Sequence, residues 1–170
     1  MFRFVATLCL VAAPTLAAIH AEDPPEVKEF VSKDGKYKAM FPGKVETKES
    51  TAKEGGATIY NASSLPKPGK LFSVVYFDLP VEIPADKVKE TLPQFLAGIK
   101  GKSLSDKEVT IGKDKIPGRE AVYEMKGAHI RMLILLDGKR VYQVMVGGPT
   151  KEDVATKEAD KFIASFEITK

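Results

Sequence analysis

The sequence is poor in the residues that many catalytic and metal centres use. It has no tryptophan, one cysteine and two histidines among 170 residues. Cys9 and His20 both precede residue 22, so a chain cleaved after Ala21 has no thiol and keeps only His129. Disulfide bonds and thiol catalysis are excluded for that chain. Zinc binding or histidine-dependent chemistry would have to rely on a single imidazole.

Arginine is also scarce. The chain has 22 lysines but only four arginines, and the lysines are interspersed with Asp and Glu at a net charge of +3. Recognition of phosphates and base edges favours the rigid fork of arginine over the mobile, strongly hydrated lysine. This pattern indicates a solvated surface, and it argues against nucleic acid as a partner.

Long apolar runs are absent except at the N-terminus, where Arg3 is followed by about 16 uncharged residues, 4–19. This run is shorter than the ~20 residues that span a bilayer, and small residues follow it, which is typical of a secretory signal peptide. We expect residues 1–21 to be the signal peptide, 22–29 a flexible leader and 30–170 a single domain. The protein would then be exported, to a periplasm or outside the cell. An uncleaved signal anchor is the alternative.

Alternating apolar residues and tight turns predict mostly strands. An early pair is expected around Asp34 and Gly35, with Tyr37, Ala39 and Phe41 on one side and a stop at residues 42–43. Apolar residues at helical spacing predict two amphipathic helices, over about 84–101 and about 150–166. Pro93 should kink the first helix or begin a second short one. Thr150 and Asp153 resemble a capping box at the start of the other helix.

The hairpin around Asp137 and Gly138 carries apolar residues on both faces. If these two are the loop residues, Leu136 faces Lys139 and Ile134 faces Val141. Both faces must then be covered. We therefore predict an α+β fold: an antiparallel β-sheet of about seven strands with one helix on each face, an α/β/α sandwich.

This order of elements resembles the PsbP-like fold, named for an extrinsic subunit of photosystem II. The segment "DGKYKAMFPGKV" resembles the opening of exported bacterial proteins of that type, and "YQVMVGGPTKEDVATKEADKFIASFEI" resembles their ending. The resemblance covers the chain as architecture and short patterns. It implies a binding or assembly module without catalytic activity, and it transfers no functional residue to this sequence.

One polar cluster is a candidate site. A tight turn at residues 126–127 would place Glu124 opposite His129, with Arg131 two residues further on the same face. A catalytic grouping would make the protein a hydrolase, but a cross-strand ion pair explains the same residues. Four tyrosines are scattered over the predicted strands, and we interpret them as core and edge aromatics and not as a stacking platform: Tyr60, Tyr76, Tyr123 and Tyr142.

We expect a non-enzymatic binding or assembly module that acts on a protein or a cell-envelope component, with no cofactor and no metal. Metal-ligand spacings are missing from the sequence. The alternative is a small-ligand-binding protein with a pocket between the sheet and the first helix, because Pro93 and the apolar sheet could leave space there. The stretch at residues 36–44 is interpreted as a mark of the fold and not as part of a site.

Overall fold

The computed structural model describes residues 25–52 and 56–169. The predicted signal peptide, residues 1–21, lies outside the described residues. No helix in the described part of the chain is long and apolar enough to cross a membrane.

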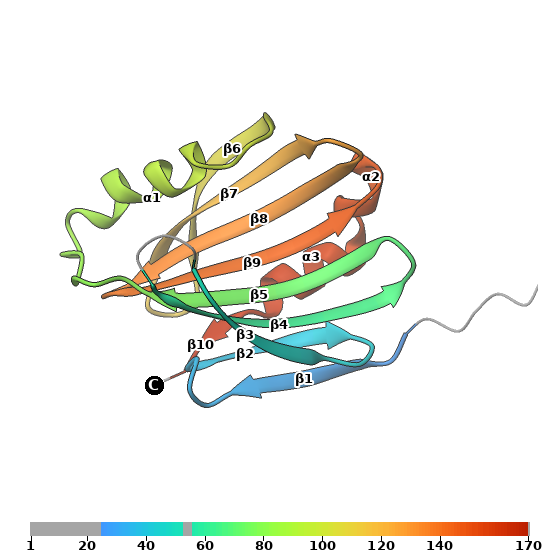
Figure 1. The fold of residues 1–170 in the computed structure, drawn as a ribbon, viewed down its shortest axis with the longest axis horizontal. Coiled ribbons are helices and arrows are strands. Elements are labelled where there is room, and N and C mark those ends of the chain that lie inside the picture. Colours follow the sequence, from blue (N-terminus) through green and yellow to red (C-terminus); the bar gives the residue numbers. More distant parts are fainter. Residues whose placement is uncertain (1–24, 53–55, 170) are drawn as a thin grey trace, which may run out of the picture.

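A seven-stranded antiparallel sheet forms the body of the protein (Figure 1). This confirms the predicted α+β fold. In spatial order its strands are β3 (Glu46–Thr51), β4 (Thr58–Lys67), β5 (Lys70–Asp78), β9 (Arg140–Gly148), β8 (Ala128–Asp137), β7 (Ile116–Met125) and β6 (Lys102–Ile111).

A second, three-stranded sheet has the order β1 (Val27–Ser32), β2 (Tyr37–Pro42) and β10 (Glu167–Ile168). The β1–β2 hairpin is the early pair that the sequence predicts. However, β1 begins at Val27, so residues 27–29 are strand and do not belong to a flexible leader. Their hydrogen-bonded pairing with β2 fixes the backbone of these residues, although their polar composition predicted a flexible segment.

Three helices of the described residues accompany the sheets. The first, α1 (Val88–Ala97), is one helix that contains Pro93. The predicted C-terminal helix is interrupted instead, as α2 (Lys151–Val154) and α3 (Lys157–Ser165). Thr150 and Asp153 form the expected capping box, and Thr156 then caps α3 by accepting a hydrogen bond from the backbone of Ala159. The second cap explains the break, because Thr156 has the extended backbone of a residue that precedes a helix.

The predicted register of the β8–β9 hairpin is wrong by two residues. Asp137 pairs with Arg140 and Leu136 with Val141, so the loop residues are Gly138 and Lys139. Gly138 takes φ +60° at the first loop position, where a type II′ turn favours glycine. The predicted Asp137–Gly138 loop would form a type I′ turn, which requires a positive φ at Asp137 as well as at Gly138. Asp137 does not have a positive φ. Because the shift is by an even number, each side chain stays on its predicted face.

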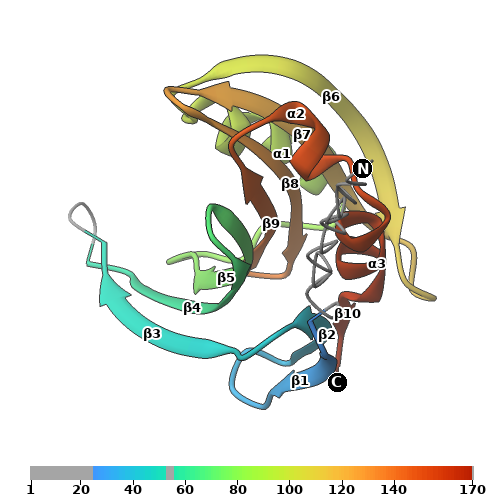
Figure 2. The ribbon, with the colours of Figure 1, turned by 90° about the vertical axis from the view of Figure 1, so that its right-hand side faces the viewer.

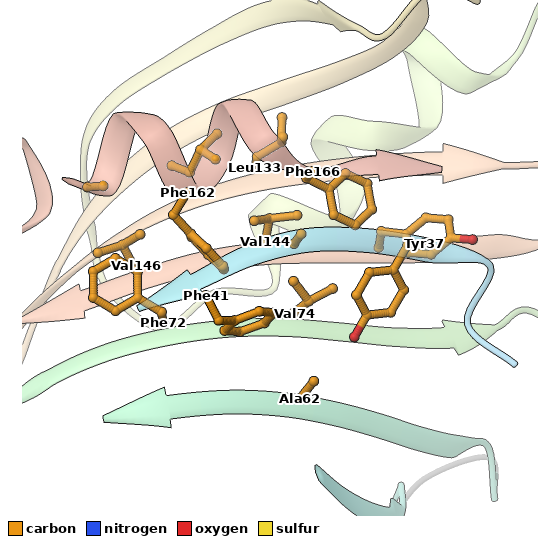
Figure 3. Packing of buried hydrophobic residues seen from close by; sticks show 14 of the residues in the cluster. Tyr37, Phe41, Ala62, Phe72, Val74, Leu133, Val144, Val146, Phe162 and Phe166 are labelled. Atoms are coloured by element: carbon orange, nitrogen blue, oxygen red, sulfur yellow. The ribbon is translucent and has the colours of Figure 1, made fainter. Parts of the chain in front are cut away.

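Both faces of the sheet are covered, as predicted. On one face, α1 packs through Val88, Leu92 and Leu96 against β7, β8 and β9. On the other, α3 and the small sheet enclose the larger core. Phe162 of α3 lies between Phe41 and Phe72, with ring centroids 4.9 and 5.2 Å away, as Figure 3 shows. Burial of such aromatic side chains stabilises the fold by about 1.5–3 kcal/mol each.

Viewed from its end, the large sheet curves around α3, and the small sheet lies below the helix (Figure 2). The two sheets together form an incomplete ring. One opening lies between β1 and β3, and the other lies between β10 and the β6–β7 turn.

Candidate functional site

The predicted polar cluster does not form one site. Glu124 does pair with His129 across β7 and β8, as the register required. The imidazole, however, places Nδ1 3.2 Å from the carbonyl oxygen of Pro149, which can only accept a hydrogen bond. The Glu124 carboxylate lies 4.0 Å from the ammonium of Lys102 on the neighbouring strand. Glu124 and His129 therefore contact different partners, Lys102 and Pro149, and not each other.

Arg131, the third member, joins three elements. Its Nε donates to Glu120 of β7 at 2.9 Å, and its Nη1 donates to Asp160 of α3 at 2.6 Å. Lys107 of β6 adds a second cation 3.5 Å from Glu120. This network fixes α3 to the large sheet, and it accounts for Arg131 as a structural residue.

The space beneath α1 is filled by side chains, which removes the basis for the ligand pocket expected there. Leu92, Leu96, Ala121, Tyr123 and Ile134 pack together in it. A hollow of about 160 Å³ remains at the margin, between α1 and the β6–β7 pair. Pockets for small molecules usually measure about 300–1,000 Å³. Within the described residues, no group of three or more His, Cys, Asp or Glu is placed to hold a metal ion.

The opening between β1 and β3 is a longer feature, which we call the β1–β3 groove. It consists of two adjoining hollows of about 390 and 460 Å³ that meet at Phe30. Together they run along β1 from Glu26 to the turn at residues 33–34. Across the groove lie β3 and the segment that leads into it.

The edge of β1 carries backbone groups that have no partner within the described part of the chain. Gly43 donates to the carbonyl of Glu26, which fixes the alternation of the β1–β2 ladder. In an antiparallel pair every second residue turns its N–H and C=O away from the partner strand. The residues that do so here are Val27, Glu29 and Val31, three positions on the free edge of the small sheet.

The edge of β3 has the same property. Ala52 donates to the carbonyl of Ala57, so Thr47, Glu49 and Thr51 turn their backbone groups away from β4. Since β3 is the last strand of the large sheet, this edge is also free. Among residues 25–52 and 56–169, the groove therefore has unpaired strand edges on both sides.

Tyrosines line the groove at the end next to the β1–β2 turn. Tyr60 of β4 stacks on Tyr76 of β5 with ring centroids 4.7 Å apart and an interplanar angle of 9°. Tyr37 lies beside Tyr76, with ring centroids 6.1 Å apart. Burial is the main cause that raises the pKa of Tyr37, and the neighbouring Tyr76 raises it further. Tyr60 is 36% exposed, so the stack reaches the surface of the groove.

A set of polar contacts fixes the β1–β2 hairpin to the large sheet. Arg140 forms a two-pronged ion pair with Asp78, at 2.6 and 3.0 Å, and donates from Nη1 to the carbonyl of Asp34 at 2.7 Å. The Tyr142 hydroxyl donates to the carbonyl of Gly35 at 2.8 Å. Hydrogen bonding to Arg140 lowers the pKa of Asp78. The turn is thus held rigidly, and with it one wall of the groove.

The outer face of the small sheet carries three exposed apolar side chains around Glu29. Val27 and Val31 of β1 are 50% and 51% exposed, and Met40 of β2, diagonal to both, is 37% exposed. Exposed apolar side chains in one patch favour contact with another molecule. This patch adjoins the free edge of β1.

The opening beside β10 is larger in volume but has fewer free backbone groups with which a strand could pair. It measures about 710 Å³ and lies between β10 and the β6–β7 turn. Thr169 donates to the carbonyl of Lys36, so only Ile168 of β10 turns its backbone groups outward. One free residue cannot form a ladder, which leaves the β1–β3 groove as the stronger candidate.

The sequence interpretation missed this site. It treated residues 36–44 as a mark of the fold, whereas the hairpin that contains them forms a wall of the groove. Tyr76 is a core aromatic and Tyr60 a surface one, as expected, but no sequence pattern indicated that they stack beside the groove. The signal that was available is the alternation of Val27 and Val31 with charged residues, which is typical of an edge strand.

No family model matches the chain, and no curated protein matches it by sequence. Solved structures do match. The solution structure of cyanobacterial PsbP (CyanoP) from Synechocystis sp. PCC 6803 has a TM-score of 0.57 and 12% identity, covering 90% of this chain and 98% of that one. A crystal structure from Bacteroides thetaiotaomicron VPI-5482 has a TM-score of 0.50 and 19% identity.

The second match covers 84% of this chain but 48% of the other, so the chain spans about half the length of the Bacteroides protein. At these identities the likeness concerns the fold. The chain thus has a PsbP-like fold, as its sequence patterns suggested.

Proposed function

We propose that this protein is an exported, non-catalytic binding module that holds an extended segment of a partner protein in the β1–β3 groove. The segment adds to the free edge of β1 as a further strand, a mode in which main-chain hydrogen bonds give affinity and side-chain contacts give specificity. The observation that supports this most directly is the row of outward backbone groups on Val27, Glu29 and Val31 along the groove.

The shape of the groove favours a single strand without neighbours of its own. A second copy of this chain would offer its β1 already paired to β2 over six residues. Such a hairpin is about one strand spacing, 4.7–4.9 Å, wider than a lone segment. We therefore assign the groove to a terminal segment or an open loop of another protein.

Export is part of the proposal and is supported by the signal-peptide pattern of residues 1–21. N-terminal sequencing of the protein from the envelope or secreted fraction tests it. We expect the chain to begin at Glu22. Recovery of the intact N-terminus in the cytoplasm would contradict export.

A proline substitution gives a sharp test of strand addition. Glu29→Pro removes an N–H that points out of the β1–β2 ladder, and proline is tolerated at such edge positions. Glu29→Ala removes the same charge but keeps the N–H, so it is the matched control. Lys28→Pro removes a donor inside the ladder and should weaken the fold by about 1 kcal/mol.

The probes are blocked hexapeptides of alternating Val and Thr, titrated into ¹⁵N-labelled protein. We expect the amide signals of Val27, Glu29 and Val31 to shift and to gain protection from hydrogen exchange. Glu29→Pro should abolish binding with little change in the free energy of unfolding, while Glu29→Ala keeps it. Binding that survives Glu29→Pro, or an absence of binding to wild type up to millimolar peptide, would contradict strand addition.

The absence of catalysis can be tested separately. Hydrolysis of ester or peptide substrates by the purified protein, lost on His129→Ala, would show that His129 has a catalytic role. We expect no such turnover, because the His129 imidazole is engaged with a backbone carbonyl.

A further inference from the structure

The end of the β1–β3 groove next to the β1–β2 turn contains an aromatic surface beside a carboxylate that has no ion pair among the described residues. The Tyr60 ring has one face on Tyr76, and its exposure shows that the rest of the ring is open to the groove. Among the described residues, cations lie over Phe72 and Tyr76 but not over Tyr60. Its free ring surface is therefore available to a ligand.

Glu49 lies directly opposite Tyr60 in the β3–β4 ladder. Residues directly opposite each other project from the same face of a sheet, with Cβ atoms about 4.5–5.5 Å apart. Glu46 of the same strand has Lys44 as an ion-pair partner, and Glu120 of the large sheet has Arg131. Within the described part of the chain, Glu49 has no ion pair.

Other charges near this end of the groove do not neutralise Glu49. Lys48, which also lines this end of the groove, precedes Glu49 on β3, and the two side chains alternate to opposite faces of the strand without forming an ion pair. The β1–β2 turn contributes Lys33 and Asp34, one charge of each sign. The negative charge of Glu49 thus remains available to a cation that rests on Tyr60.

We propose that Tyr60 and Glu49 form a subsite for an arginine side chain of the bound segment. This inference rests on the proposed function and adds the chemistry of the partner. A guanidinium is planar and stacks on an aromatic face while its N–H groups reach a carboxylate, which a compact ammonium does less well. The Arg140 guanidinium, 5.0 Å from the ring centroid of Tyr76, shows the same contact within the protein.

The test compares blocked hexapeptides of alternating Val and Thr in which one position is arginine, moved along the peptide in turn. Each has a twin with citrulline, which has nearly the same shape but no charge. By titration calorimetry, we expect the best arginine peptide to bind wild type roughly tenfold more tightly than its citrulline twin, from a stacked cation plus an exposed ion pair.

Variants of the subsite locate the effect. Tyr60→Leu and Glu49→Gln should each reduce the arginine-to-citrulline ratio roughly threefold, because each removes one of the two contacts. Tyr60→Phe keeps the ring and should keep the ratio. Glu46→Gln is the matched control for Glu49, because it removes a carboxylate from the same strand but from the opposite face.

The two proposals fail in different ways. If neither peptide of any pair binds wild type, strand addition is refuted and the subsite with it. If both twins of every pair bind wild type equally, the subsite is refuted while strand addition stands. An arginine-to-citrulline ratio that keeps its wild-type value in Tyr60→Leu would also refute the assignment, because another part of the protein would then recognise the charge.

Discussion

Tyr142→Phe should weaken the attachment of the β1–β2 hairpin to the large sheet. The substitution removes one hydroxyl from a side chain that is 1% exposed and leaves the ring in place. The lost contact is the 2.8 Å hydrogen bond from that hydroxyl to the carbonyl of Gly35. A buried carbonyl left without a donor costs about 1–3 kcal/mol, and we expect the free energy of unfolding at pH 7 to fall by that amount.

The effect should depend on pH. Burial raises the pKa of Tyr142 to about 12 from the ordinary 10.0. Because the folded state holds this proton more tightly than the unfolded state, the contribution of Tyr142 is complete below pH 10 and is lost as the pH rises toward 12. Two pKa units correspond to roughly 2–3 kcal/mol. Phenylalanine does not titrate, so the variant escapes this loss.

Urea unfolding of both proteins at pH 7 and pH 11 measures the difference. We expect the deficit of Tyr142→Phe to shrink markedly at pH 11. The other buried tyrosines of this region, Tyr37 and Tyr76, are present in both proteins, so their titration largely cancels in the difference. A deficit that is the same at both pH values would refute the proposed origin, as would a variant as stable as wild type at pH 7.

Three further substitutions test the fold. Thr156→Ala removes the cap of α3 and should cost about 0.5–2 kcal/mol, while Thr156→Ser should restore most of it; thermal unfolding followed by circular dichroism measures both. Gly118→Ala places a methyl carbon 2.5 Å from the Leu135 side chain and should cost about 1–3 kcal/mol in urea unfolding, where an unchanged stability would contradict the packing. Asp78 has a lowered pKa, so its ion pair with Arg140 adds stability above pH 3.8 that is lost as the pH falls further. Asp78→Asn should lower the free energy of unfolding at pH 7 by about 1 kcal/mol, a value that allows for solvent exposure of the pair. The stability of this variant should also depend less on pH below 3.8, as urea unfolding at several pH values measures.

The fold was largely predictable because each face of the large sheet is encoded locally. Leu133, Leu135 and Val144 alternate with residues of the opposite core, and the helical stripes are equally regular. These patterns determine which side chains are buried whether or not the register is known. The register itself depends on the φ values of two turn residues, so choosing Asp137 in place of Lys139 as a loop residue shifted the pairing while leaving the faces correct.

The candidate site was less predictable because it depends on contacts between distant segments. Tyr60 and Tyr76 stack only after β4 and β5 pair, and Arg140 reaches the turn at Asp34 across 106 positions of the chain. Glu124, His129 and Arg131 show the reverse case. Their register was correct, but side chains from β6, α3 and the Pro149 segment provided the actual partners.

The free edges of the two sheets differ in how well they are protected. The edge strand β6 carries charged side chains such as Asp106, Lys107 and Glu108, which is a common defence against pairing with other chains. β10 is too short to form a ladder. β1 combines six residues of strand, outward backbone groups and the exposed Val27 and Val31. An edge with these properties invites aggregation unless it has a partner, and the rigid attachment of its hairpin by Arg140 and Tyr142 holds it open in one geometry. That combination is the physical reason for placing the binding function at β1.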